Sequence, residues 1–435
     1  MILNIDKMKS DSRLKFSESV FDAYVENTCA YFKNISENIS KISPDDSIDI
    51  ISVLCEFKEY FISESEWEQI TKHMLNMLQK GIKRSLFDKI SNFSGLAHIA
   101  FVIYGLSLKA PKIEPFLQGI NELLLSNLAE FIKNSDKKSF NTEGNYEVIK
   151  GLSGPLRYLL NFEDDEKMSM MAVRLVDVLI KRSHDIRIQG HRLPGWHYYP
   201  SEIEKSFSPV GAVNGCVNYG VSHGIGSPLA VLSVAYKSDI RKTEIKNAID
   251  GLFSEYMNAL YYVDDIPYWP GKISFEQYIG QDEIIYAPNQ MSWCYGSVGI
   301  LRALYMSSVA ISDDKVKMFA INELIKISQM DLSNYLLTMP IICHGLVGTA
   351  AILNLMYLET GKTEFLQKIT EMIESSAVIS AEQFFEIEKQ NARKLGVSPH
   401  LNQHNYLDAR KSILKNTEKV INSRHGKTIQ AGRVF

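Results

Sequence analysis

Two kinds of apolar pattern alternate along the chain. In DDKVKMFAINELIKI, which begins at Asp313, apolar residues recur at helical spacing on one face and leave the other face polar. In VGTAAILNLMYLETG, which begins at Val347, apolar residues surround the whole helix. A helix with one polar face lies at the surface, whereas a helix without one must be covered on every side. The sequence therefore predicts an all-α fold with outer amphipathic helices and inner buried helices.

Short glycine-bearing motifs precede apolar helices and recur along the chain. They are SGLAHIAFVIYGL, KGLSGPLRYLL, SHGIGSPLAVL, CYGSVGILRALY and CHGLVGTAAIL. Their spacing fits a repeat of roughly 50 residues with inserts, which suits one helical hairpin per unit. Such hairpins either stack as an open solenoid or close into a ring. We favour the ring, an α/α toroid, because closure covers every inner face without capping repeats. Glycine at the start of each inner helix lets the backbones approach each other closely.

Two stretches interrupt the helical pattern. Residues 184–219 and 262–292 are rich in turn-forming and aromatic residues, which predicts short strands and loops. Both stretches come just before a glycine motif, so we expect both at the same end of the helices, where loops carry function. We predict a single toroid domain over residues 1–435, with 184–219 as a strand- and loop-rich extension inserted into it.

Composition and charge exclude several classes of protein. The N-terminal segment lacks the apolar core of a secretory signal, and no apolar run reaches the length of about 18 residues typical of a membrane span. We therefore expect a cytoplasmic protein. A formal net charge of -4 argues against a nucleic-acid partner bound by bulk electrostatics. Five scattered cysteines form a poor disulfide framework, so a cysteine with a function is expected to bind metal or act in catalysis.

Three residues in two of the glycine motifs form the sharpest chemical feature. Cys294 comes just before Gly296, and Cys343 and His344 come just before Gly345. Two thiolates and an imidazole are three of the four ligands of a tetrahedral zinc ion, and three protein ligands with an open fourth position form the catalytic arrangement. Because Cys343 and His344 are adjacent, they can share a metal only from a loop or the first turn of a helix. The alternative interpretation is that both cysteines are small buried hydrophobic residues.

Three further residues are candidates for the same site. His223 occupies the equivalent position of the SHGIG motif, where it either transfers a proton or forms a hydrogen bond at a helix start. Tyr295 either brings a phenol to the site or packs as most tyrosines do. Glu147 either orients a histidine or is a solvated surface charge. The local sequence leaves each pair of interpretations open.

The motifs SHG, WCYGSVG and CHGLVG, in this order on a helical repeat, resemble the lanthionine synthetase C-like proteins. This family includes the LanC cyclases of class I lanthipeptide biosynthesis, and the resemblance covers roughly residues 90 to 360. It implies an α/α toroid with one zinc ion in the central cavity. The ligands implied by the motifs are Cys294, Cys343 and His344.

The resemblance also carries over residues with catalytic roles. His223 matches the family's active-site histidine, and Tyr295 matches the tyrosine of the CYG motif. Glu147 stands where the family usually has an aspartate. This is a departure from the family pattern, in which a longer carboxylate would have to reach the same partner.

The family resemblance implies a reaction and its partners. The reaction is a zinc-dependent intramolecular Michael addition of cysteine thiols to dehydroalanine or dehydrobutyrine, which forms lanthionine or methyllanthionine thioether rings. The expected partner is a dehydrated precursor peptide with its leader, which the insert at 184–219 is a candidate to bind. The family further implies a complex with a lanthipeptide dehydratase and an ABC transporter at the inner face of the cell membrane.

Other functions stay open as alternatives. A prenyltransferase-like enzyme is also a thiol-activating zinc α/α toroid, but it normally uses an aspartate, a cysteine and a histidine, which two cysteine motifs disfavour. A non-catalytic LanC-like scaffold would bind a peptide or glutathione without closing a ring. A metal-free helical solenoid would serve protein interaction, and metal content alone separates it from the others.

Overall fold

The computed structural model describes residues 18–377, except 94, 136–144, 202–204, 206–209 and 212. The ends of the predicted domain, 1–17 and 378–435, and parts of the predicted insert at 184–219 therefore lie outside the described residues. The chain divides into two compact units. The described residues of the first unit fall within Met1–Phe87, Val102–Pro115 and Ser328–Arg433, and those of the second fall within Asp88–Phe101 and Phe116–Ile327.

Helical hairpins make up the first unit in its described residues. Helix α3 packs against α4, and α15 packs against α16. A capping box starts α3: the Ser43 hydroxyl accepts the backbone N–H of Asp46, and the Asp46 carboxylate accepts the backbone N–H of Ser43. The elements are α2 (Glu18–Glu37), η2 (Ile39–Lys41), α3 (Pro44–Phe57), η3 (Lys58–Tyr60), α4 (Glu64–Lys83), η4 (Pro111–Ile113), η5 (Leu332–Tyr335), α15 (Leu346–Thr360) and α16 (Glu364–Ala377).

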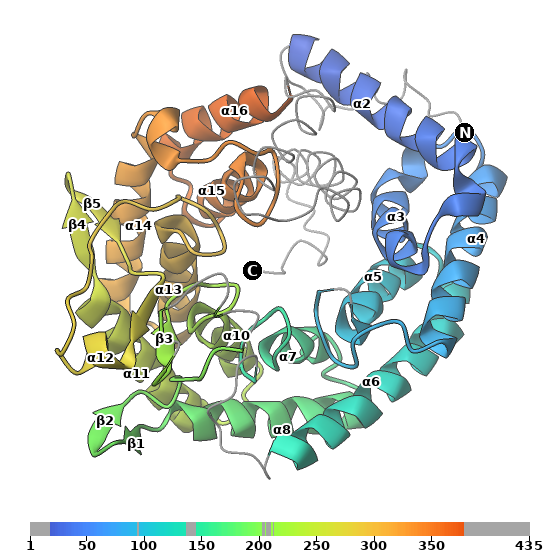
Figure 1. Cartoon of the computed structure of the whole chain (residues 1–435). Coiled ribbons are helices and arrows are strands. Elements are labelled where there is room, and N and C mark those ends of the chain that lie inside the picture. Colours follow the sequence, from blue (N-terminus) through green and yellow to red (C-terminus); the bar gives the residue numbers. More distant parts are fainter. Residues whose placement is uncertain are drawn as a thin grey trace. The chain divides into compact units, whose positions relative to one another are not determined.

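The second unit combines helices with three small sheets. Helix α10 packs against both α11 and α13, as Figure 1 shows. The helices are α7 (Ser153–Leu159), α8 (Glu166–Ser183), α10 (Gly226–Lys237), α11 (Lys242–Ala259), α12 (Phe275–Tyr278), α13 (Ser297–Ile311) and α14 (Asp314–Ser328). Two further helices, α5 (Leu96–Lys109) and α6 (Glu114–Ser135), contain residues of both units, and the last residue of α14, Ser328, belongs to the first unit.

The predicted difference between inner and outer helices is confirmed for the two segments that carried it. Helix α15 is buried on several sides, with Leu353 and Met356 inaccessible to solvent, although Leu358 in its last turn is 40% exposed. Helix α14 buries Leu324 on its apolar face and exposes Asp314 at its start. Among the described helices, none is both long enough and apolar enough to cross a bilayer.

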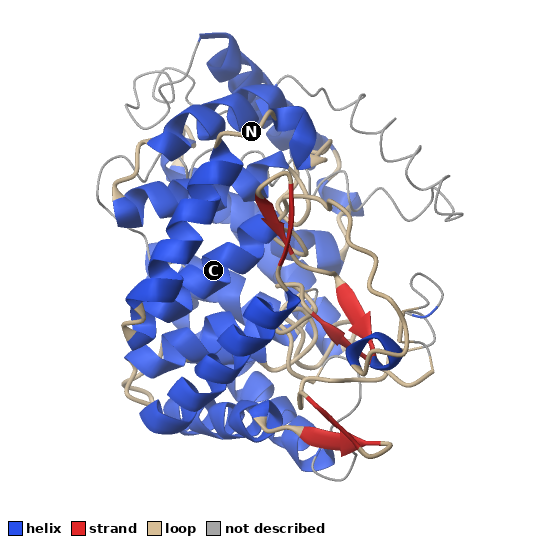
Figure 2. Ribbon diagram, turned by 90° about the vertical axis from the view of Figure 1, so that its left-hand side faces the viewer, coloured by secondary structure: helices blue, strands red, loops and turns tan. Residues whose placement is uncertain are grey.

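Both predicted interruptions contain short antiparallel strands. The first holds β1 (Ile186–Ile188), β2 (His191–Leu193) and β3 (Cys216–Asn218), and the second interruption and its edge hold β4 (Tyr261–Val263), β5 (Ile266–Tyr268) and β6 (Lys272–Ser274). The strands β1–β2 and β4–β5 are local hairpins, whereas β3 pairs with β6 in the register Asn218↔Lys272. Figure 2 shows the strands together on one side of the helices. The pairing of β3 with β6 joins the two interruptions, and the sequence pattern did not specify this pairing.

Candidate active site

The loop that carries Cys294 is folded tightly over the start of α13. Gly296 is the N-cap of α13, and a Cβ atom at Gly299 would lie far inside van der Waals contact with the carbonyl oxygen of Trp293. Only glycine leaves room for this backbone crossing. The crossing holds Cys294 in a buried position directly before the helix, with its Sγ 3.4 Å from the Ser292 hydroxyl oxygen.

The loop that carries Cys343 and His344 repeats this construction before α15. Gly345 is the N-cap, and a Cβ atom at Gly348 would overlap the carbonyl oxygen of Ile342, again six residues earlier in the chain. The Gly348 N–H donates to the Ile341 carbonyl at 3.3 Å, as the N–H of the corresponding glycine in the first loop does to Ser292. The shared glycine spacing therefore produces the same loop twice and presents a cysteine from each.

Gly348→Ala is expected to lower the free energy of unfolding by at least about 3 kcal/mol, because the added methyl overlaps backbone that cannot rotate away. Gly251→Ala in α11 is the matched control, since a Cβ there meets nothing within 4 Å. That control should gain up to about 1 kcal/mol from helix propensity. Urea unfolding of both variants measures the difference, and equal midpoints would contradict the loop geometry.

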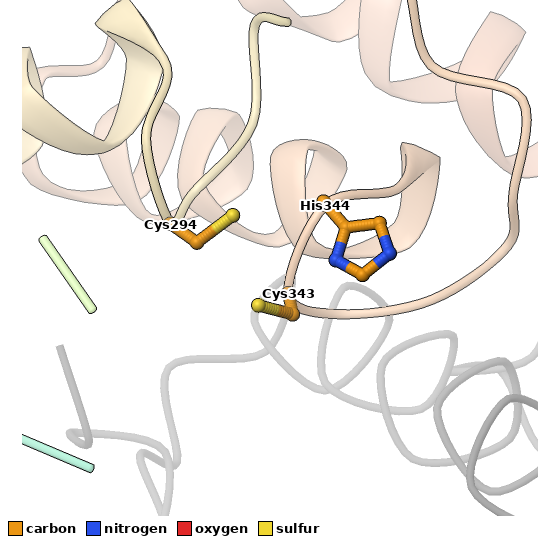
Figure 3. Close-up of side chains that lie close together, drawn as sticks. All are labelled: Cys294, Cys343 and His344. Atoms are coloured by element: carbon orange, nitrogen blue, oxygen red, sulfur yellow. The ribbon is translucent and has the colours of Figure 1, made fainter. Parts of the chain in front are cut away.

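Cys294, Cys343 and His344 form a group whose ligand atoms all lie within 4.8 Å of one another. Figure 3 shows the three side chains close together. Donors that share a tetrahedral zinc ion lie about 3.5 Å apart, given Zn–S of about 2.3 Å and Zn–N of about 2.0–2.1 Å. The soft donor set therefore fits zinc, and the exposed His344 leaves the group accessible to a further ligand.

Glu147 lies beside His223, with Oε2 3.3 Å from the histidine Nδ1. The carboxylate is 2% exposed and accepts the backbone N–H groups of Ile149, Lys150 and Gly151 at 2.6–2.9 Å. It is therefore not the solvated surface charge of the alternative interpretation. A carboxylate accepts from the imidazole Nδ1–H, which leaves Nε2 as the free nitrogen of the neutral ring. The His223 side chain is 45% exposed, so a substrate can reach it.

Backbone hydrogen bonds join the loop of His223 to that of Cys294. The Cys294 carbonyl accepts the N–H groups of Val221 at 2.7 Å and Ser222 at 3.2 Å. Ser227, in the first turn of α10, donates its hydroxyl proton to the Val221 carbonyl and accepts the N–H of Val148 at 3.0 Å. Because Val148 follows Glu147 in the chain, Ser227 connects the loops of Glu147 and His223. Three segments far apart in sequence are thereby held in one arrangement.

Tyr295 lies over the backbone of Gly220, where an added Cβ would be 2.7 Å from the ring atom Cδ1. Its hydroxyl oxygen is 3.1 Å from Nδ2 of Asn218, a fully buried residue of β3. Neither Asn218 nor Ser227 was predicted from the sequence. Neither residue type stands out chemically, and the only local signal is their closeness to the SHG motif. Five of the six predicted site residues fall into two groups, the sulfur–imidazole group and the pair Glu147–His223. The sixth, Tyr295, follows Cys294 in the chain.

A buried positive charge lies near the Glu147 loop. Tyr146 is 2% exposed, and burial raises the pKa of its phenol, an effect that the Arg182 guanidinium opposes. The guanidinium carbon of Arg182 is 5.0 Å from the centre of the Tyr146 ring, and burial lowers the pKa of Arg182 to about 10. At neutral pH, Arg182 therefore stays charged and Tyr146 stays neutral.

The chain is similar to known proteins over most of its length. The family model described as lanthionine synthetase C-like protein matches residues 49–398. The nisin biosynthesis protein NisC of Lactococcus lactis subsp. lactis is 23% identical over 314 residues, which cover 70% of this chain and 71% of that protein.

A solved structure of nisin cyclase resembles the chain with a TM-score of 0.67 and 21% sequence identity, over 86% of this chain and 91% of that one. This likeness confirms the fold class predicted from the sequence, an α/α toroid with a small β-containing insert.

Proposed function

The chain belongs to the lanthionine synthetase C-like family, and on this premise we propose that it is a zinc-dependent lanthipeptide cyclase. Its substrate is a precursor peptide whose serine and threonine residues have been dehydrated to dehydroalanine and dehydrobutyrine. Its products are lanthionine and methyllanthionine rings. The similarity to the nisin biosynthesis protein and to nisin cyclase supports this substrate class.

The observation that carries the proposal is the group Cys294, Cys343 and His344. Three protein donors leave one tetrahedral position for a substrate ligand, whereas a structural zinc site has four protein donors. When bound there, zinc lowers the pKa of a coordinated thiol, so that a substrate cysteine is a nucleophilic thiolate at neutral pH. Cys294 and Cys343 as thiolates already add negative charge to the site, which keeps an incoming sulfur electron-rich.

His223 and Glu147 handle the proton of the reaction. The substrate sulfur forms a bond to the β-carbon, the electron pair of the C=C bond moves toward the α-carbon and its carbonyl, and the α-carbon then takes a proton. The thiol proton and the α-carbon proton balance, so the overall reaction is an isomerisation. Glu147 accepts from Nδ1 of His223, which leaves the lone pair on Nε2, and from Nε2 the histidine removes the thiol proton and returns a proton to the α-carbon.

Holding the peptide is the remaining task of the protein. Proximity within the site decides which cysteine meets which alkene. We assign leader binding to the strand-containing insert at 184–219. A dehydratase and an ABC transporter at the inner face of the cell membrane are the partners proposed from the family, with the protein itself in the cytoplasm.

Thiol counting tests the proposal directly. Ring closure leaves the peptide mass unchanged but removes one alkylatable thiol per ring. The zinc-loaded protein is incubated with a dehydrated precursor peptide, and the product is alkylated and examined by mass spectrometry. Fewer alkylated thiols than in the enzyme-free control are expected. Peptide binding without thiol loss would instead identify a non-catalytic scaffold. Absence of both binding and thiol loss would refute both functions.

A further inference from the structure

Asn218 connects Tyr295 to the loop of His223. It is fully buried on β3, and its side-chain Nδ2 is 3.1 Å from the Tyr295 hydroxyl oxygen. Its Oδ1 accepts the backbone N–H of Gly220 at 2.9 Å, and its backbone carbonyl accepts the N–H of Ile225 at 2.9 Å. The single residue therefore contacts both sides of the segment that carries His223.

The orientation of the Asn218 amide is fixed by its partners. The backbone N–H of Gly220 can only donate, so the atom facing it must be the amide oxygen. The amide nitrogen then faces Tyr295, and an amide nitrogen donates but does not accept. It follows that the Tyr295 hydroxyl oxygen accepts the hydrogen bond from Asn218. The hydroxyl proton of Tyr295 consequently points away from Asn218.

The position of the Tyr295 ring is constrained as well. The ring lies against Gly220, where an added Cβ would be 2.7 Å from Cδ1 and 2.9 Å from the Cys294 carbonyl oxygen. That carbonyl is itself held by the N–H groups of Val221 and Ser222. The segment from Asn218 to Ser222 therefore constrains the ring of Tyr295, and Asn218 contacts its hydroxyl oxygen.

We propose that Asn218 is a positioning residue that makes Tyr295 a hydrogen-bond donor toward the reacting peptide. This inference rests on the proposed cyclase function. Attack of sulfur on the β-carbon places negative charge on the carbonyl oxygen of the dehydro residue. A preorganised O–H donor stabilises that charge without reorientation at the moment of reaction. The proton taken up by the α-carbon still comes from His223, so Tyr295 ends the reaction unchanged.

Asn218→Asp reverses one hydrogen bond and preserves the other. One carboxylate oxygen still accepts the Gly220 N–H, while the second oxygen can only accept and forces the Tyr295 hydroxyl to donate to it. The first readout is the infrared C–O band of Tyr295, isolated as the difference from Tyr295→Phe in zinc-loaded protein without substrate. In Asn218→Asp the frequency of this band is expected to shift from that of a phenol that accepts a hydrogen bond to that of a phenol that donates one. An unchanged band would overturn the inference.

The control for added charge is Asn127→Asp on α6, whose side chain donates to the Leu123 carbonyl one turn earlier. It is expected to leave the band, the zinc content and the thermal midpoint unchanged. A band change of the same size in Asn127→Asp would show that charge, rather than the local hydrogen bond, moves the Tyr295 band, and would overturn the inference.

The second readout is the cyclisation rate in a double-mutant cycle. Asn218→Asp is expected to slow ring closure about tenfold or more, in the range of single oxyanion donors. In the Tyr295→Phe background the same change is expected to alter the rate by less than about twofold, because the hydroxyl through which Asn218 acts is gone. If Asn218→Asp slowed cyclisation by the same factor with and without the Tyr295 hydroxyl, Asn218 would have a merely structural role. Absence of cyclisation in the unaltered protein would refute the proposed function, while the infrared band would still decide the hydrogen-bond direction.

Discussion

Cys294→Ala, Cys343→Ala and His344→Ala are each expected to lose zinc and cyclisation together. Each change leaves two protein donors, which is below the three of a catalytic zinc site. Bound zinc measured by atomic absorption should fall from about one ion per chain to under about a tenth, and the thiol-counting assay should show no ring formation above the enzyme-free rate.

The control separates loss of a ligand from loss of a cysteine. Cys55→Ala removes a buried thiol of α3 that lies outside the site. It is expected to cost about 1 kcal/mol of stability and to keep full zinc occupancy. Stoichiometric zinc in Cys343→Ala would refute the ligand assignment. Loss of zinc in Cys55→Ala would show that metal content reports folding instead of ligation.

Glu147→Gln is expected to slow cyclisation on the order of 10²–10⁴-fold while zinc stays bound. The amide can still accept from Lys150 and Gly151 through its oxygen, but its NH₂ group then faces His223 Nδ1. A donor at this position makes Nδ1 the acceptor and moves the ring proton to Nε2. The histidine would then present the wrong nitrogen to the substrate thiol. His223→Ala should give a loss of similar size, again with zinc retained.

For Glu147→Gln the free energy of unfolding must be measured alongside the rate, because the NH₂ group of the new side chain also faces the Ile149 N–H. The expected cost is about 1–3 kcal/mol, which leaves a folded protein. Glu147→Asp keeps a carboxylate and matches the residue that the family usually carries, so it should retain more activity than Glu147→Gln. Cyclisation at the unaltered rate in Glu147→Gln would exclude an orienting role for this carboxylate.

The departure at Glu147 has a structural explanation in the turn that it occupies. Three successive backbone N–H groups, from Ile149 to Gly151, converge on the two carboxylate oxygens. Such a turn binds a carboxylate through its own backbone. Because a carboxylate oxygen can accept more than one hydrogen bond, Oε2 can also accept from His223. The backbone of its own loop therefore accommodates the Glu147 carboxylate, which also contacts the histidine.

Several parts of the site were accessible from the sequence because their signals are local. The glycine spacing around Cys294 and Cys343 predicted two similar loops at helix starts, and the structure contains both, built on the same backbone crossing. The thiol and imidazole donors were identified from residue chemistry and the family motifs. For Glu147, the same local information could not decide between a surface charge and a buried partner of His223.

The sequence by itself determined that α14 buries one face and α15 most of its surface, where strands interrupt the helices, and which residues carry metal-binding chemistry. Each of these follows from periodicity or residue type within a short segment. Only the tertiary structure decided that β3 pairs with β6, that Glu147 contacts His223, and that Asn218 holds Tyr295. These partners are more than fifty residues apart, so their contacts depend on how whole helices pack, which no local pattern encodes.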